Sequence, residues 1–262
     1  MIRIYAIFLR QVLLIRRSIH RLLGIFYWAL LDLLLWGFLT VYLHKVGQDR
    51  LSGITVLIGT VVLWNFLMRV QQGVGVSFLE DVWARNLMSL LASPLSIREY
   101  MSGLVVVGTT SAFFSLAIMT AVAWLLFSYN IFQFGFLMIP FVAILFLFGL
   151  GLGIFTTAMI LRFGPSSEIL AWSIPALIPP FSGVFYPVAT LPKALQYIAF
   201  ILPSSHVFEG MRAAVFTSRV DWQNLILGFL LAFLFVIASF FFLHRSYRYV
   251  LRNGLLTRFS TE

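Results

Sequence analysis

The side chains that carry out catalysis in most enzymes are scarce in this sequence and form no known catalytic pattern. The chain has no cysteine, which excludes disulfides, thiolate metal sites and cysteine nucleophiles. Its two lysines, Lys45 and Lys193, follow histidine and proline, whereas a phosphate-binding loop needs glycine directly before its lysine. No G-x-S-x-G, H-E-x-x-H or D-x-D pattern occurs. We therefore expect no catalytic site, and active work would draw its energy from another subunit or from an ion gradient.

The histidines and the positive charge do not indicate a metal site or a nucleic-acid partner. His20, His44, His206 and His244 are far apart in sequence and form no H-x-x-x-H pair, so we expect no bound metal. The formal charge is +9, but the basic residues flank apolar runs and do not form one patch. In membrane proteins such an excess sets the orientation. We expect membrane lipids, and no nucleic acid, as partners.

The composition indicates a membrane protein. Apolar residues make up 61% of the 262 residues and charged residues 10%, against roughly 45–50% and 25% in soluble domains. A mean hydropathy of +0.99 agrees. We predict an all-α fold in which residues 22–262 form a single domain of six transmembrane helices, each near the roughly 20 residues that cross the hydrocarbon core. The predicted spans are 22–43, 51–70, 102–128, 134–161, 169–188 and 223–243.

Residues 1–21 are predicted to form an amphipathic helix ahead of the first span. Arg3, Arg10, Arg17 and Arg21 share one face at about 3.6 residues per turn. A basic face opposite an apolar one suits a helix lying in the membrane interface. The alternative is a cytosolic extension of the first span.

A second amphipathic helix is predicted over residues 79–91, between spans two and three. Leu79, Val82 and Leu87 lie on its apolar side, and Pro94 cannot continue it. The segment is too polar to cross the membrane, so we place it at the cytoplasmic surface. Its polar side carries Glu80, Asp81, Arg85 and Asn86.

Prolines mark the segment before the last span. Seven of the nine lie between Pro165 and Pro203, and three of them interrupt the fifth span, where we expect a kink or a break. The helical pieces within residues 189–217 are too short to cross, so we expect them to dip into the outer leaflet and return. Such re-entrant backbone persists only against protein or water.

Two further features concern orientation and buried charge. Thirteen Lys and Arg side chains fall on the side of the N-terminus and five on the other, which predicts that both termini are cytoplasmic. Asp32 is an acid inside the first span, where ionisable groups usually have a function. Two interpretations stay open: a proton path, or a hydrogen bond to a polar residue such as Asn65 or Thr110.

The chain as a whole resembles the permease subunits of ABC-2 type exporters. Two segments carry the resemblance: the short helix that closes in LLASPLSIREY, and FSGVFYPVATLPKALQYIAFILPSSHVFEGMR before the last span. The pairing of these two segments is more specific than either alone. The resemblance implies a multi-pass protein of the inner membrane of a bacterium or archaeon.

The resemblance also implies partners. In the family, the helix between spans two and three is a coupling helix that docks on a separate ATPase subunit, which binds ATP and Mg²⁺. The permease works as a homodimer or as a heterodimer with a similar permease. The resemblance gives the coupling role to Glu80, Asp81, Trp83, Arg85 and Asn86.

An outer gate is expected where the family's re-entrant helices cover the exit of the pathway. The resemblance places Pro203, Glu209 and Arg212 there, and the last two are spaced to form an ion pair. Because irregular backbone needs partners in lipid, we expect residues 179–186, with Pro179, Pro180, Phe185 and Tyr186, to face the second permease.

The substrate is less determined by the sequence. The segment FSGVFYPVATLP favours an exporter of drug-like or other amphiphilic molecules, and the alternative is an exporter of lipid-linked polysaccharide. Two functions of another class also stay open, a non-transporting membrane scaffold and an ion-coupled carrier. A scaffold needs neither the amphipathic nor the re-entrant segment, and a carrier often has internal repeats, which are not evident here.

Overall fold

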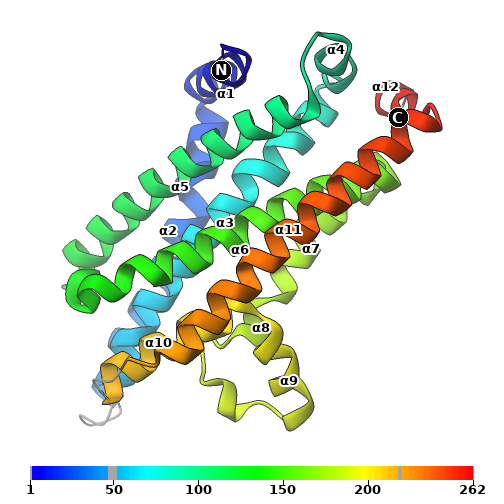
Figure 1. Ribbon diagram of the computed structural model, residues 1–262. Coiled ribbons are helices and arrows are strands. Elements are labelled where there is room, and N and C mark those ends of the chain that lie inside the picture. Colours follow the sequence, from blue (N-terminus) through cyan, green and yellow to red (C-terminus); the bar gives the residue numbers. More distant parts are fainter. Residues whose placement is uncertain (1, 47–51, 218–219, 262) are drawn as a thin grey trace.

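The protein is a bundle of long helices, described here from a computed structural model that places residues 2–46, 52–217 and 220–261. Five helices in these ranges run between the two ends of the bundle (Figure 1). They are α2 (Ile19–Val46), α3 (Ser52–Trp83), α5 (Ile97–Phe127), α6 (Met138–Phe163) and α11 (Trp222–Arg252). The described residues contain no strand, so the all-helical prediction is confirmed for them.

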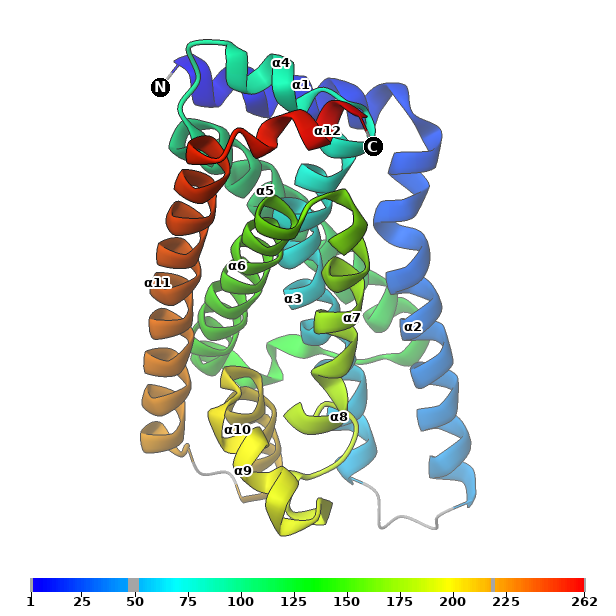
Figure 2. The same ribbon diagram turned by 90° about the vertical axis from the view of Figure 1, so that its right-hand side faces the viewer.

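The short helices lie at opposite ends of the bundle (Figure 2). α1 (Ile2–Arg17), α4 (Leu87–Ala92) and α12 (Arg258–Thr261) lie at one end, together with both chain ends, and we call it the terminal end. α8 (Pro179–Ser182), α9 (Lys193–Ile201) and α10 (Pro203–Thr217) lie toward the other, the distal end.

Four helical segments among the described residues are long and apolar enough to cross a membrane. They are Phe26–Leu43, Ile97–Phe127, Ile131–Phe163 and Trp222–Arg252. α3 contains most of the predicted second span, whose first residue lies outside the described ranges. The count of six spans therefore stays a prediction.

The fifth predicted span is divided, as its prolines indicate. α7 (Ile169–Leu177) contains Pro175 and ends before Ile178, because Pro179 and Pro180, the next two residues, offer no backbone N–H for the helical ladder. Beyond α8 the chain leaves the helix at Gly183, with φ +69°. The predicted re-entrant segment 189–217 contains two helices, α9 and α10, that meet at Leu202.

Both predicted amphipathic helices have different ends in the structure. α1 ends at Arg17 and is separated from α2 by Ser18, so Arg21 belongs to the first turn of α2. The segment 79–91 is not one helix. Its first residues are the last turn of α3, and α4 starts only at Leu87, after a break at which Arg85 adopts φ +53°. Leu79 and Val82 are buried in the core, which keeps this turn in α3.

Glycines allow the backbone of α3 to pack closely against α5 and α6. A Cβ atom on Gly73 would lie 2.2 Å from the Cα of Gly108 on α5. On α6, Cβ atoms on Gly149 and Gly153 would lie 2.6 and 2.9 Å from carbonyl oxygens of α3. Small residues at such crossings permit close van der Waals packing, which supplies much of the association energy of helices in lipid. α3 is therefore the central helix of the bundle.

We predict that Gly73→Ala lowers the midpoint of thermal unfolding of the detergent-purified protein. Overpacking typically costs about 1–3 kcal/mol, and here the clash is with backbone that cannot rotate away. Gly24→Ala is the matched control, because its Cβ meets nothing within 4 Å. An unchanged midpoint for Gly73→Ala would contradict the described contact of α3 with α5.

Candidate functional site

The carboxylate of Asp81 joins three helices at the terminal end. Arg10 on α1 donates from Nη2 to Oδ1 at 2.5 Å and from Nη1 to Oδ2 at 3.1 Å. Tyr100 on α5 donates its hydroxyl to Oδ2 at 2.7 Å. Asp81 is 2% exposed, so this bidentate pair is shielded from water. The hydrogen bond to Asp81 raises the pKa of Arg10 above its ordinary value, and the guanidinium stays charged.

Asp81 therefore does not lie on the exposed polar surface where the sequence analysis placed it. Its buried carboxylate accepts hydrogen bonds from Arg10 and Tyr100 of the same chain. Arg85 and Asn86, in the break between α3 and α4, are exposed. The physical reason is that residues 79–83 continue the packed helix α3, so the side chain of Asp81 faces Arg10 of α1. A sequence periodicity of one segment does not reveal a partner 71 positions away.

Glu80 and Trp83 connect the same end of α3 to two further helices. Glu80 lies 3.3 Å from Arg21 on α2. The indole N–H of Trp83 donates to Glu168, at the start of α7, over 2.5 Å. The last turn of α3 is thus linked by side chains to α1, α2, α5 and the segment before α7.

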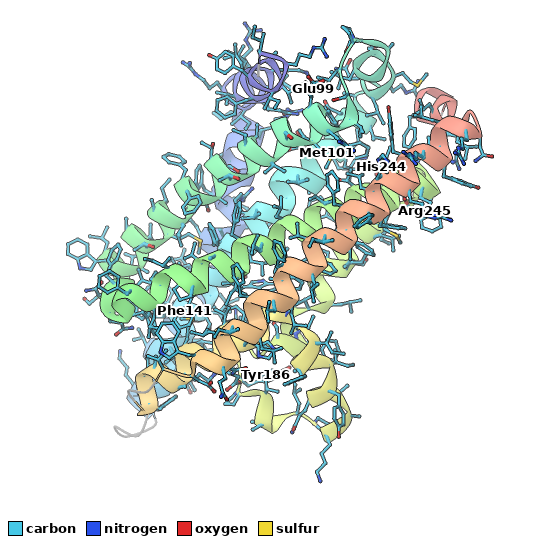
Figure 3. All side chains as sticks on the ribbon, in the orientation of Figure 1. Glu99, Met101, Phe141, Tyr186, His244 and Arg245 are labelled. Carbon is cyan, nitrogen blue, oxygen red and sulfur yellow. The ribbon has the colours of Figure 1, made fainter. Side chains whose placement is uncertain are left out.

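The start of α5 is fixed by a capping box that also reaches α1. Ser96 accepts a hydrogen bond from the backbone N–H of Glu99, and the Glu99 carboxylate accepts from the backbone of Ser96. Arg3 on α1 lies 3.3 Å from the same carboxylate, and Figure 3 shows Glu99 between α1 and the start of α5. The S-x-x-E spacing was a sequence signal for this helix start that the sequence analysis did not use.

A cleft of about 330 Å³ opens beside these contacts, and we call it the terminal cleft. Two guanidiniums, of Arg21 and Arg69, and the Glu80 carboxylate line it. The side-chain amide nitrogen of Gln11 is buried and has no hydrogen-bond partner among the described residues. The other polar and aromatic lining residues are Gln72, Ser77, Ser111, Trp28, Trp83 and Trp172. Guanidinium and amide donors beside indole rings suit a ligand with anionic or hydroxyl groups and ring faces.

The distal end contains the ion pair that the sequence spacing predicts. Arg212 donates to Glu209 at 2.9 Å, one helical turn apart on α10. Arg212 also donates to the carbonyl of Gly183, and Glu209 accepts the backbone N–H of Val188 at 2.7 Å. The pair thereby satisfies the backbone of the irregular segment after α8. From α3, Thr60 donates its hydroxyl to the Val184 carbonyl at 2.8 Å.

These contacts correct the expectation that the whole segment 179–186 faces a second permease. Ser182 and Val184 are fully buried in their own chain, because α3 and α10 supply the partners that the irregular backbone needs. Phe185 stacks on Trp36 of α2 with ring centroids 4.3 Å apart. Pro180 and Tyr186 are exposed, Pro179 is half-buried, and Pro203, at the start of α10, is buried.

Asp32 is exposed on α2 and has a partner on the neighbouring helix α3. Asn65 on α3 donates to its carboxylate at 3.4 Å, which is one of the two interpretations left open, whereas Thr110 donates to its own helix. Among the described residues, no three His, Asp or Glu side chains are grouped to hold a metal ion.

Comparison with known proteins identifies the family. The family model "ABC-2 type transporter" matches residues 3–216. The chain belongs to this family. It is also 28% identical over 146 residues to the "Capsule polysaccharide export inner-membrane protein CtrC" of Neisseria meningitidis serogroup A / serotype 4A. That match covers 55% of the chain and 47% of CtrC, so the chain spans about half the length of this curated relative.

In this ABC-2 transporter chain, the structure gathers the predicted residues into two groups. Glu80, Asp81 and Trp83 lie together at the terminal end, and Glu209, Arg212 and the segment 179–186 lie together at the distal end. The sequence analysis missed the partners Tyr100 and Glu168, since single polar residues in apolar or loop segments give no pairing signal. The arginine face of residues 1–21 was the available signal for the contacts to Asp81 and Glu80.

We predict that single cysteines separate the buried and exposed parts of the distal segment. Ser182→Cys and Val184→Cys should react with a polar maleimide only through local opening, because both sites are fully buried. Tyr186→Cys and Tyr197→Cys, at positions 36% and 75% exposed, should react promptly. The chain has no other cysteine, so the labelling rate reports one site. Equal rates at all four positions would contradict the described burial.

Proposed function

We propose that this chain is the permease subunit of an ABC exporter that moves a lipid-linked polysaccharide out across the inner membrane. A separate ATPase subunit binds ATP and Mg²⁺ and supplies the energy, and two permeases form the working unit. The terminal cleft is the observation that carries the proposal. It is the site where the sugar and phosphate groups of the substrate first contact the permease.

The chemistry of the cleft fits such a substrate better than a purely apolar one. Arg21 and Arg69 offer donors to phosphate oxygens, and the unpaired amide of Gln11 offers a donor to a hydroxyl or phosphate. Trp28 and Trp172 are 71% and 46% exposed and present ring faces on which sugars stack. A drug-like amphiphile would leave the buried amide nitrogen of Gln11 without a hydrogen-bond partner, at a cost in affinity.

The relative supports the same choice between the two substrates. The sequence alone favours a drug-like molecule, but CtrC is by its name a capsule polysaccharide exporter. That name and the polar lining of the terminal cleft lead us to propose the polysaccharide alternative.

The coupling to ATP hydrolysis follows from the same end of the bundle. In this proposal the terminal end is cytoplasmic, as the charge distribution predicts. The exposed Arg85 and Asn86 contact the ATPase subunit, and Glu80, Asp81 and Trp83 transmit its movement to α1, α2, α5 and α7. The distal contacts of Glu209 and Arg212 form the outer gate, which opens when α3 and α10 move apart.

We predict that the double variant Trp28→Ala/Trp172→Ala weakens substrate recognition. In proteoliposomes that hold the permease with its ATPase subunit, a lipid-linked glycan should stimulate ATP hydrolysis. Each lost ring contact costs about 0.5–1.5 kcal/mol, so half-maximal stimulation should need roughly tenfold more glycan. The basal ATP hydrolysis should stay unchanged.

Trp222→Ala is the matched control, because Trp222 is 58% exposed at the start of α11, outside the cleft. If the glycan fails to stimulate the wild-type transporter while a sugar-free amphiphile does, the substrate is of the other class. If the double variant Trp28→Ala/Trp172→Ala responds like the wild type, the terminal cleft is not the recognition site.

A further inference from the structure

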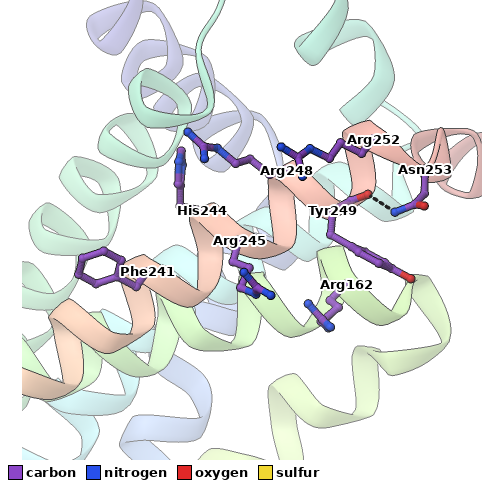
Figure 4. Close-up of a pocket in the computed structure, with 8 residues that line it drawn as sticks. All are labelled: Arg162, Phe241, His244, Arg245, Arg248, Tyr249, Arg252 and Asn253. Carbon is purple, nitrogen blue, oxygen red and sulfur yellow. Dashed lines mark hydrogen bonds between the residues drawn. The ribbon is translucent and has the colours of Figure 1, made fainter.

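Four arginines line one open groove at the terminal end of α11, and none of them is among the site residues used above. Arg245, Arg248 and Arg252 come from α11, and Arg162 comes from α6 (Figure 4). The groove has a volume of about 750 Å³, and Phe241, His244, Tyr249 and Asn253 also line it. We call it the arginine groove.

Helix periodicity accounts for the position of the three arginines of α11. The α11 positions are three, four and seven apart, so they share one exposed face of the helix. Arg162 is half-buried and lies over the ring of Tyr249, 4.9 Å from its centroid. The Asn253 amide donates to the Tyr249 carbonyl at 2.7 Å and holds the end of the helix. Arg162 is therefore positioned by an aromatic ring and not by an acid.

The charges of the groove are uncompensated within the described residues. No Asp or Glu lines the groove, and none of the four arginines forms an ion pair in the described part of the chain. This differs from Arg3, Arg10, Arg21 and Arg212, which each pair with a carboxylate. Like charges held near one another repel, so an anion from outside the chain would stabilise the arrangement.

The surface next to the groove indicates where that anion comes from. Phe241, at the groove's edge, is 71% exposed, and the exposed face of α11 continues away from the terminal end with Phe233, Leu234 and Phe240. This face belongs to a helix apolar enough to cross a membrane. The groove thus begins where the lipid-facing surface ends, at the level of the headgroups.

We propose that the arginine groove binds the phosphate of an anionic phospholipid from the surrounding leaflet, with the acyl chains along the apolar face of α11. Guanidiniums that line the groove donate to phosphate oxygens in the forked geometry that arginine offers. A free phosphate would use the same donors but would gain nothing from the exposed phenylalanines. The proposal is independent of the exported substrate, because neither the terminal cleft nor the distal gate contributes a residue.

Native mass spectrometry of the detergent-purified chain tests the proposal. The wild type should retain phosphatidylglycerol in preference to phosphatidylcholine of the same chain length. The variant R245Q/R248Q/R252Q should bind phosphatidylglycerol about a hundredfold more weakly, at roughly fivefold for each guanidinium near anionic headgroups. The matched control R16Q/R17Q/R85Q removes the same charge at exposed positions outside the groove and should bind like the wild type.

Three results would overturn the proposal. Equal loss in the control variant would mean that net charge alone attracts the lipid. Displacement of the lipid by an equal concentration of inorganic phosphate would mean that the groove takes soluble anions. Loss of a co-purified ATPase subunit from the groove variant, with lipid retention unchanged, would assign the groove to a protein contact. If the triple variant is not monodisperse, the single variant R162Q should still show a roughly fivefold loss.

Discussion

The buried carboxylate of Asp81 is the contact on which the arrangement of the terminal end depends. A charge taken out of water costs several kcal/mol unless it is paired and hydrogen-bonded, and here Arg10 and Tyr100 meet both requirements. Removing one partner would leave the other buried without compensation. The pair therefore fixes α1 across the ends of α3 and α5, which places Gln11 in the wall of the terminal cleft.

At the distal end, buried backbone groups also need hydrogen-bond partners. The proline-rich segment after α7 satisfies only part of its N–H and C=O groups by its own backbone hydrogen bonds, and in lipid each unsatisfied group costs several kcal/mol. Glu209, Arg212 and Thr60 supply the partners from α10 and α3. Because α3 is one continuous helix from Ser52 to Trp83, it carries contacts to both ends. No break in the helix separates the contacts at its two ends.

Composition and local spacing predict part of this structure. The apolar runs predict the long helices, the prolines predict the break near Ile178, and the three-residue spacing predicts the ion pair of Glu209 with Arg212. The burial of Asp81 was not predictable, because it depends on Arg10 from a helix 71 positions earlier. The end of the second amphipathic segment was predicted to within one residue, since Pro94 marks a helix stop and α4 ends at Ala92. The break inside the segment, at Arg85, was missed because no proline or glycine marks it. The cleft needs residues of α1, α2, α3, α5 and α7 in their final positions, and the groove needs residues of α6 and α11.

A double-mutant cycle on ATP-driven transport tests the central claim most directly. Arg10→Gln, Asp81→Asn and the double variant would be compared in proteoliposomes that contain the permease with its ATPase subunit. If the Asp81 contact transmits the movement of the motor, each single variant lowers the transport rate, and the double variant is no worse than the more impaired single one. That non-additivity corresponds to an interaction energy of about 0.5–3 kcal/mol. Losses that multiply in the double variant, as for independent sites, would contradict the account.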